Sequence, residues 1–224
     1  SDVCSSDLYA VWHGPTGLTR IARQVTDRAH QLASALRAAG LDVADQQFFD
    51  TIRIRTKGGA KELWNRAREG GYTLDLVDGD ILQISVDETV TDDELRELTQ
   101  LLGGSTDEIR GPADGAWPED LRRTSSFMTH PVFSSYHTET TMMRYLKRLA
   151  DRDYGLDRGM IPLGSCTMKL NAAAEMEAMT WPAFSQMHPF APVEDQAGSL
   201  RLIRDLESWL AELTGYDTVS LQPN

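Results

Sequence analysis

The longest periodic run in the sequence predicts an amphipathic helix between Thr16 and Ala39. Apolar residues recur there at three- and four-residue steps, which places them on one face of a helix. Gly40 ends the pattern, and glycine is the residue that most often follows a helix C-terminus. This run defines the first element of the fold, and the residues after it predict the others.

Strands are predicted next. Thr51–Arg55 alternates apolar and polar residues, as a half-buried strand does. Tyr72–Leu76 and Ile81–Val86 flank Asp78-Gly79, a dipeptide typical of the tight turn between two antiparallel strands. A hairpin is therefore expected at these residues.

Further helices are predicted between and after the strands. Ala60–Glu69 has a helical pattern that Gly70-Gly71 closes. Thr91–Glu94 has the sequence of a capping box and opens a helix that carries Leu95 and Leu98. The order helix, strand, helix, strand, strand, helix predicts a compact α/β unit that ends near Gly103.

The chain changes character beyond this unit. Gly104–Arg123 holds Gly, Pro, Asp and Ser without periodicity and predicts a linker. A helix is predicted over Glu139–Ala150, followed by an irregular stretch to about Gly198 with one short helix near Ala172. Because this stretch is rich in aromatic and Met residues, we expect it to line a site or an interface.

The last predicted elements are a helix and a strand. Apolar residues from Leu200 to Leu213 recur with helical spacing, and Gly215 stops the pattern. Asp217–Gln222 predicts the beginning of a strand.

Composition and charge argue against several classes of protein. Hydrophobic residues make up 41% of the 224 residues, which is enough to fill a core. No stretch approaches the roughly 18 consecutive apolar residues of a membrane helix, and the net charge of −12 argues against a nucleic-acid or anionic membrane partner. Cys4 and Cys166 cannot build a disulfide framework, and no Cys/His spacing suits a metal, which predicts an intracellular protein. Ser1–Leu8 fits none of these patterns and is interpreted as a possible artefact.

The densest cluster of reactive side chains lies in Ile161–Asn171. Gly164 lets the backbone approach a ligand closely, while Ser165, Thr167 and Asn171 offer hydroxyl and amide groups for hydrogen bonds. A pocket role is one interpretation of this loop. The other is a polar loop whose side chains cap its own backbone.

Two residues of the same loop are weaker candidates for covalent chemistry. Cys166 as a nucleophile needs a histidine base and an electropositive setting. Lys169 as the covalent anchor of a cofactor needs a desolvated position at the base of a pocket, and a surface amine is the simpler interpretation.

The histidine motifs have simple structural interpretations. His137–Thr140 opens a predicted helix, and N-terminal capping with Glu139 in the first turn explains it. A pocket role for His137 is the alternative. His13-Gly-Pro15 is most simply the entry to the first helix.

Several segments occur in a fixed order along the chain. They are His13–Pro15, Tyr136–Thr140, Ile161–Asn171, Trp181–Gly198, Glu212–Asp217 and Gln222–Asn224. Together they resemble the glycine dehydrogenase (decarboxylating) family, the P-proteins of the glycine cleavage system, for which the run Pro-Leu-Gly-Ser-Cys-Thr-Met-Lys-Leu-Asn is close to a signature. The resemblance covers about Tyr9 to Asn224, with Trp12 standing where the family has a tyrosine.

The resemblance implies a fold and a domain order. Members of the family are longer proteins with two related halves, each with the aspartate-aminotransferase-like α/β fold, known as fold type I among pyridoxal-phosphate enzymes. Residues 9–103 then correspond to the small C-terminal domain of the first half, and residues 104–122 to a linker. Residues 123–224 correspond to the start of the second half, which holds the cofactor.

The resemblance also implies an activity. The family decarboxylates glycine with pyridoxal 5′-phosphate and passes the aminomethyl group to the lipoyl arm of the H-protein. Expected pocket residues are Ser165, Cys166, Thr167, Asn171 and His137, with Asn224 at the edge of the loop that holds the cofactor phosphate. The lysine that anchors the cofactor comes later in the family, so this chain alone is expected to be inactive.

Other expectations concern assembly and location. The resemblance implies a homodimer or an assembly of paired halves, in the cytoplasm of a bacterium or the mitochondrial matrix of a eukaryote. The alternative function is a non-catalytic fragment that forms a subunit interface in the same complex. An unrelated hydrolase with Cys166 as its nucleophile is a third and weaker reading.

Overall fold

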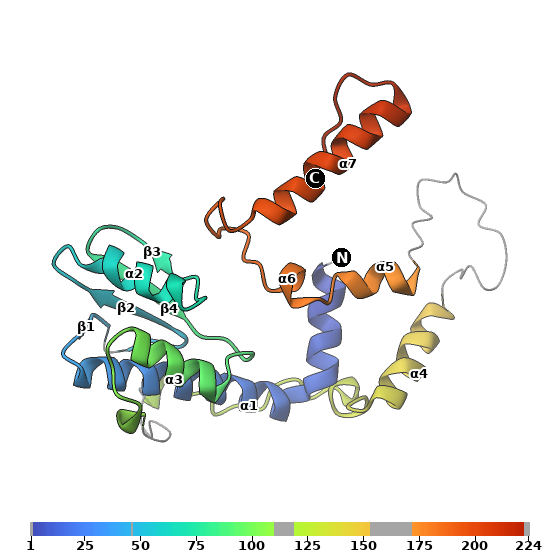
Figure 1. Cartoon of the computed structure of the whole chain (residues 1–224). Helices are drawn as coiled ribbons and strands as arrows, with labels where there is room; N and C mark the ends of the chain where they lie inside the picture. Colours follow the sequence, from blue (N-terminus) through green and yellow to red (C-terminus); the bar gives the residue numbers. More distant parts are fainter. Residues whose placement is uncertain (1, 46, 110–118, 153–171, 222–224) are drawn as a thin grey trace. The chain divides into compact units, whose positions relative to one another are not determined.

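The computed structural model describes residues 2–45, 47–109, 119–152 and 172–221 (Figure 1). The chain divides into two compact units, Ser1–Met160 and Ile161–Asn224, and each is described by itself. The domain order implied by the resemblance concerns the full-length protein and stays a prediction, as does the interpretation of Ser1–Leu8.

Helix α1 spans Asp2–Ala38 and has a break at Gly14, where φ is 61° and ψ is −179° (Figure 1). Pro15 follows the break, and proline suits the first turn of a helix because it has no N–H to leave unbonded. The predicted helix over Thr16–Ala39 is thus confirmed, and so is the helix entry at His13–Pro15. The prediction was incomplete, since a further helical segment precedes the break. No long periodic apolar run marks that segment in the sequence.

A four-stranded antiparallel sheet follows α1, in the order β1-β2-β4-β3. The strands are β1 (Asp42–Val43), β2 (Thr51–Arg55), β3 (Asp75–Leu76) and β4 (Ile81–Ser85). In the central pair, Ile52 lies opposite Ile84 and Ile54 opposite Leu82. The predictions of β2 and of the hairpin are confirmed. Strand β1 was missed because two residues show no alternation, and β3 is shorter than predicted.

The helices cover one face of this sheet. Helices α1, α2 (Ala60–Glu69) and α3 (Asp92–Leu101) contribute apolar side chains to the same buried cluster as β2 and β4. The fully buried members include Leu32, Leu36, Ile52, Ile54, Leu82 and Ile84. Because side chains alternate along a strand, Arg53 and Gln83 lie on the opposite, polar face. The arrangement is a two-layer α/β unit, as the order of elements predicted.

Helix α3 begins with the predicted capping box. The Thr91 hydroxyl accepts a hydrogen bond from the Glu94 amide at 3.2 Å, and the Glu94 carboxylate accepts one from the Thr91 amide at 2.7 Å. Two amides at the start of the helix are thereby bonded. Tyr72 packs against the same helix, where its hydroxyl donates to Glu97 at 2.9 Å.

The described residues between Gly104 and Arg152 form short 3-10 turns and one longer helix. The turns are η1 (Thr106–Glu108), η2 (Glu119–Leu121) and η3 (Pro131–Ser134), and the helix is α4 (Glu139–Ala150). Helix α4 has the predicted bounds. The second unit is described from Ala172 to Leu221.

This second unit contains α5 (Ala173–Ala178), α6 (Pro182–Ser185) and α7 (Ala197–Thr214). The short helix near Ala172 and the helix ended by Gly215 are confirmed, and Gly215 has φ 76°, as a helix-ending glycine often does. The strand predicted at Asp217–Gln222 is wrong for Asp217–Leu221, which is irregular. A strand requires a neighbour to accept its backbone hydrogen bonds, and the described residues of this unit include none.

Candidate functional site

Most of the residues predicted to line the pocket lie outside the described residues. The loop with Ser165, Cys166, Thr167 and Asn171 falls in residues 153–171, and Asn224 in residues 222–224. Their roles therefore remain predictions. His137 is described, and it lies where two of the family motifs meet.

The meeting point is the break in α1 at Gly14. A side chain at Gly14 would place its Cβ 2.5 Å from the Phe133 carbonyl oxygen and 2.9 Å from Cε1 of His137. Both distances are too short for a real Cβ, and φ of 61° is a conformation that favours glycine. Only glycine allows the chain to turn here and the η3 segment to approach so closely.

His137 is held against this turn by a hydrogen bond. Its Nδ1 lies 2.6 Å from the backbone carbonyl oxygen of Trp12. A carbonyl oxygen can only accept, so Nδ1 carries the hydrogen, and a neutral ring then has its lone pair on Nε2. Because Trp12 accepts this bond through its backbone, the bond does not depend on the side chain at position 12. We call the residues Trp12–Pro15 and Phe133–His137 the motif corner.

Helix α4 continues directly from the motif corner. Thr138 is its N-cap residue and accepts a hydrogen bond from the Thr141 amide at 3.3 Å, which confirms the capping interpretation of this motif. The Tyr136 ring stacks on Tyr145, with centroids 4.2 Å apart and planes at 14°. The Arg148 guanidinium lies 5.4 Å from both ring centroids and donates to the Tyr136 hydroxyl. These contacts fix the direction in which α4 leaves the corner.

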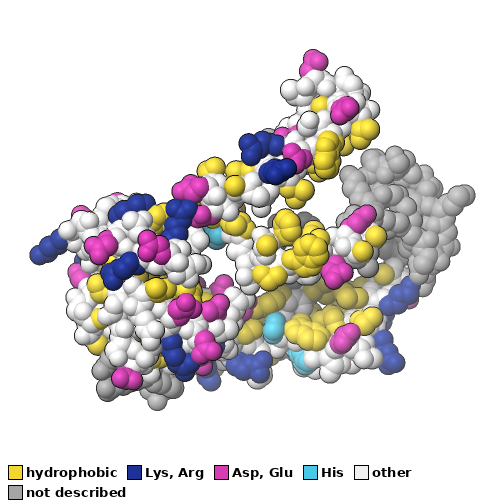
Figure 2. Space-filling view, viewed as in Figure 1, with side chains coloured by type: hydrophobic (Ala, Val, Ile, Leu, Met, Phe, Trp, Pro, Cys, Tyr) yellow, Lys and Arg dark blue, Asp and Glu magenta, His cyan; other side chains and the backbone are white. Residues whose placement is uncertain are grey.

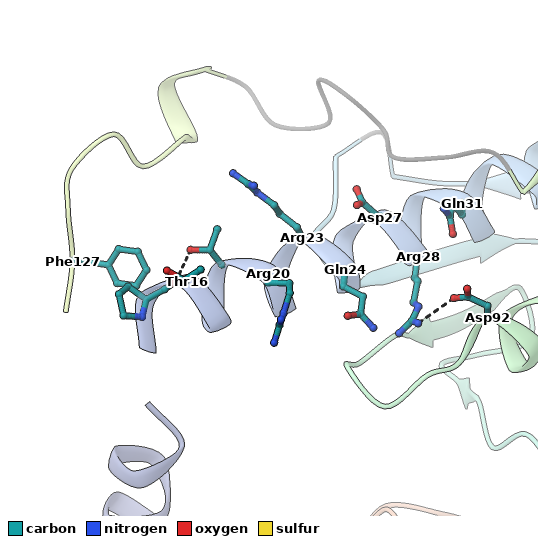
Figure 3. Close-up of a pocket in the computed structure, with 11 residues that line it drawn as sticks. Thr16, Arg20, Arg23, Gln24, Asp27, Arg28, Gln31, Asp92 and Phe127 are labelled. Carbon is teal, nitrogen blue, oxygen red and sulfur yellow. Dashed lines mark hydrogen bonds and ion pairs between the residues drawn. The ribbon is translucent and has the colours of Figure 1, made fainter. Parts of the chain in front are cut away.

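A groove of about 670 Å³ runs along α1 beside the motif corner (Figure 3). Thr16 and Phe127 lie at one end of it, while Arg28 and Asp92 lie at the other, with 3.1 Å between their charged groups. Figure 3 shows Arg20 and Arg28 projecting to one side of the helix and Arg23 to the other. Guanidinium groups bind anions but do not transfer protons near neutral pH, so the groove offers binding groups more than acid–base groups.

The cofactor that the resemblance implies does not fit this groove. Pyridoxal-phosphate enzymes hold the cofactor through a lysine, and the groove lining contains no lysine. The residues expected to contact its phosphate are outside the described ranges. Within the described ranges, no group of His, Cys, Asp or Glu side chains is placed to bind a metal ion, and no helix has the length and apolar character needed to cross a membrane.

Sequence reasoning found the two motifs of the corner but missed their contact. His13–Pro15 was interpreted as a helix entry and His137–Thr140 as a cap, and both interpretations are confirmed. The contact joins residues 125 positions apart in the chain, which local patterns cannot reveal. The one available signal was glycine between His13 and Pro15, since glycine often marks a close approach of two backbones.

Comparison with known proteins agrees with the motifs. The family model for the glycine cleavage system P-protein matches residues 3–102. All of the chain aligns at 93% identity with the glycine dehydrogenase (decarboxylating) of Cutibacterium acnes, and 98% of it aligns at 49% identity with proteins of that name from Xanthomonas axonopodis pv. citri and Stenotrophomonas maltophilia. The chain spans 22–23% of the length of these relatives. The resemblance is thereby confirmed: the chain is similar along its whole length to one segment of these glycine dehydrogenases, and residues 3–102 match the P-protein family.

Proposed function

We propose that this chain is a segment of an enzyme that decarboxylates glycine and transfers the aminomethyl group to the lipoyl arm of the H-protein. The observation that carries the proposal is the 93% identity, along the whole chain, to a glycine dehydrogenase (decarboxylating). Pyridoxal phosphate, bound in the complete enzyme, would supply the electron sink for the loss of CO2. The chain alone is proposed to be inactive, because it spans 23% of the length of that relative.

A pocket for glycine and the lipoyl arm is proposed around the loop 161–171. Its proposed members are Ser165, Cys166, Thr167 and Asn171, with Asn224 at the edge of the cofactor phosphate loop and His137 as a further member. For His137 the support is geometric. The hydrogen bond from Nδ1 to Trp12 at 2.6 Å fixes the ring and its tautomer. A fixed ring can present Nε2 to a ligand with little loss of side-chain entropy.

The domain type, the assembly and the cellular location of the complete enzyme are proposed from the same similarity to the relatives. The mixed α/β unit with its small antiparallel sheet is proposed to be the small domain of an aspartate-aminotransferase-like half. The complete enzyme is proposed to act as a homodimer or as paired halves. Since the relatives are bacterial proteins, cytoplasmic location is proposed for it.

The first test measures activity in a complete enzyme. The sequence of this chain replaces the matching segment of the Cutibacterium acnes protein, and we call the product the hybrid enzyme. The hybrid enzyme is expected to catalyse glycine-dependent CO2 exchange, whereas the 224-residue chain alone shows none. A folded hybrid enzyme without exchange activity contradicts the proposal, and so does exchange by the chain alone.

A second test addresses covalent cofactor binding. The chain is incubated with pyridoxal phosphate, reduced with borohydride and mapped by mass spectrometry. We expect no stoichiometric adduct in the chain and one adduct in the hybrid enzyme, outside the replaced segment. A stoichiometric adduct at Lys169 would show that the anchor lies in this chain after all.

The pocket assignment is tested in the hybrid enzyme with Thr167→Val. The change keeps the shape and removes a hydroxyl, and a buried group that loses its partner costs about 1–3 kcal/mol. If the hydroxyl acts in the transition state, exchange falls about 5- to 150-fold. Ser34→Ala, on the exposed side of α1, is the control and leaves exchange unchanged. A Thr167→Val enzyme that melts at a lower temperature but turns over normally shows that the loop is structural.

The alternative function, a non-catalytic subunit-interface segment, has one observation in its favour. In the second unit, large apolar side chains such as Trp181, Phe190 and Trp209 are more than half exposed. If this alternative is correct, Thr167→Val and Asn171→Ala leave the exchange rate of the hybrid enzyme unchanged but alter its assembly. Size-exclusion chromatography of the same variants reports that difference.

A further inference from the structure

Helix α7 carries an apolar stripe that stays exposed in the described part of the second unit. The stripe consists of Leu202, Ile203, Leu206, Trp209 and Leu213, which recur at helical spacing along one side of the helix. Their exposed fractions are 53%, 43%, 39%, 59% and 82%. Figure 2 shows hydrophobic side chains at the surface over this helix. The stripe extends from Leu202 to Leu213, about 17 Å along the helix axis, which is about three helical turns.

The other side of α7 is that of a solvated helix. Arg201 and Asp205 form an ion pair at 3.5 Å, and the Arg204 guanidinium donates to the Leu200 carbonyl at 3.2 Å. Charged groups on one side and apolar groups on the other are the pattern of a helix that packs against a core. Among the described residues 172–221, only the small side chain of Ala191 is buried, so no such core is present there.

The charges of the chain argue against two other occupants of the stripe. Amphipathic helices that lie on membranes are rich in Lys and Arg on the polar side, whereas α7 carries Glu207, Glu212 and Asp205 against Arg201 and Arg204. The chain as a whole has a net charge of −12. An anionic membrane repels such a chain, and pairing of two isolated chains through the α7 stripe alone would bring two such net charges together.

The length of the relatives indicates what covers the α7 stripe in the complete protein. The chain spans 23% of the Cutibacterium acnes protein to which it is 93% identical, so most of the apolar side chains of that protein lie in other segments. We propose that the α7 stripe is an internal packing face of the complete P-protein, covered by apolar side chains from polypeptide beyond this segment. The proposal rests on the proposed function, since it assumes that the chain works within that enzyme.

Hydroxyl-radical footprinting tests the proposal without any substitution. Tryptophan oxidation is mapped by mass spectrometry in the chain alone and in the hybrid enzyme, and two residues are compared. Trp209 is 59% exposed and Trp64 is 8% exposed in this structure, which makes Trp64 the internal control for a buried ring. In the chain alone, we expect Trp209 to be oxidised much faster than Trp64. In the hybrid enzyme the Trp209 rate is expected to fall to that of Trp64.

Other outcomes would overturn the proposal. If Trp209 is oxidised equally fast in both proteins, the stripe is not an internal face. If Trp209 of the isolated chain becomes protected as concentration rises, and the chain elutes as a dimer, a second copy is the occupant. The test is separate from that of the function: a hybrid enzyme that exchanges CO2 with Trp209 exposed refutes only the packing face, and an inactive one with Trp209 protected refutes only the activity.

Paired substitutions provide a second measurement. Leu206→Asp introduces a carboxylate into the apolar stripe of α7, while Arg204→Asp introduces the same carboxylate on the polar side of the helix. We expect Leu206→Asp to lower the melting temperature of the hybrid enzyme but not that of the chain alone, and Arg204→Asp to change neither. Equal melting temperatures for the hybrid enzyme and its Leu206→Asp variant would contradict the assignment.

Discussion

Replacing Gly14 with alanine should open the motif corner while leaving the α/β core folded. Gly14 combines φ of 61° with ψ of −179°, a conformation that glycine alone adopts readily, and another residue there costs roughly 1–2 kcal/mol or more. The new Cβ would also lie 2.5 Å from the Phe133 carbonyl oxygen, so the segments must separate and the hydrogen bond from His137 to Trp12 is lost. That bond contributes about 1 kcal/mol. The corner should therefore be destabilised by about 2–3 kcal/mol, which raises its opening equilibrium about 30- to 140-fold.

Hydrogen exchange measured by mass spectrometry resolves this local effect. Peptides that cover the motif corner should exchange faster in Gly14→Ala, whereas peptides from β2 and β4 should not change, because the buried cluster begins at Ala29 in α1. Gly40→Ala is the matched control. Gly40 also has a positive φ, 85°, but a Cβ there meets none of the described atoms within 4 Å. Gly40→Ala therefore measures the cost of placing a non-glycine residue at positive φ, without a steric clash like that between a Cβ at position 14 and Phe133.

Hydrogen exchange at the motif corner in Gly14→Ala, and in a third variant, His137→Ala, decides whether this account is correct. If Gly14→Ala leaves exchange at the corner unchanged, the close approach of Gly14 and Phe133 does not exist in solution. His137→Ala removes the hydrogen bond without backbone strain and should give a smaller increase than Gly14→Ala. If His137→Ala has the larger effect, the hydrogen bond and not the glycine is what holds the corner.

Three further predictions concern the α/β unit. Leu36→Ala, at a fully buried position, should lower the free energy of unfolding by about 2–5 kcal/mol in denaturant titration of the chain. Thr91→Ala should cost about 1 kcal/mol at neutral pH. Hydrogen bonds from Thr91 lower the pKa of Glu94, so the stabilisation by this carboxylate is present above its ordinary pKa and is lost as pH falls through the lowered one. The cost of Thr91→Ala should therefore shrink in acid, and a variant with a pH-independent cost would contradict this account. Burial, and then the hydrogen bond to Glu97, raise the pKa of Tyr72 to about 12, and Glu97→Gln should lower it in a spectrophotometric titration.

Elements with local signals were predicted well from sequence. Strand β2, helix α2 and helix α4 have the predicted bounds, because periodicity and capping residues lie within each of these segments. The capping box at Thr91 is another local signal, and its hydrogen bonds are present. Such signals require no knowledge of the rest of the chain.

Features that depend on distant partners were predicted poorly. Strand β1 exists only because Val43 pairs with Ile54 of β2, and its own sequence is too short to show a pattern. The residues from Asp217 to Leu221 have strand-like sequence but no neighbouring strand in the described part of their unit. For the candidate site, the motifs indicated the family and His137, while the contact of His137 with Trp12 required the folded chain. The roles of Ser165 to Asn171 stay predictions.

The lengths of the strands determine how this unit meets other chains. Both outer strands of the sheet, β1 and β3, are two residues long, while the five-residue strands β2 and β4 are enclosed between them. An outer strand exposes unpaired backbone N–H and C=O groups that can recruit a strand from another molecule, and a short outer strand offers very few. Such short outer strands offer little edge on which a strand of another molecule could extend this sheet, which disfavours edge-to-edge polymerisation into fibrils.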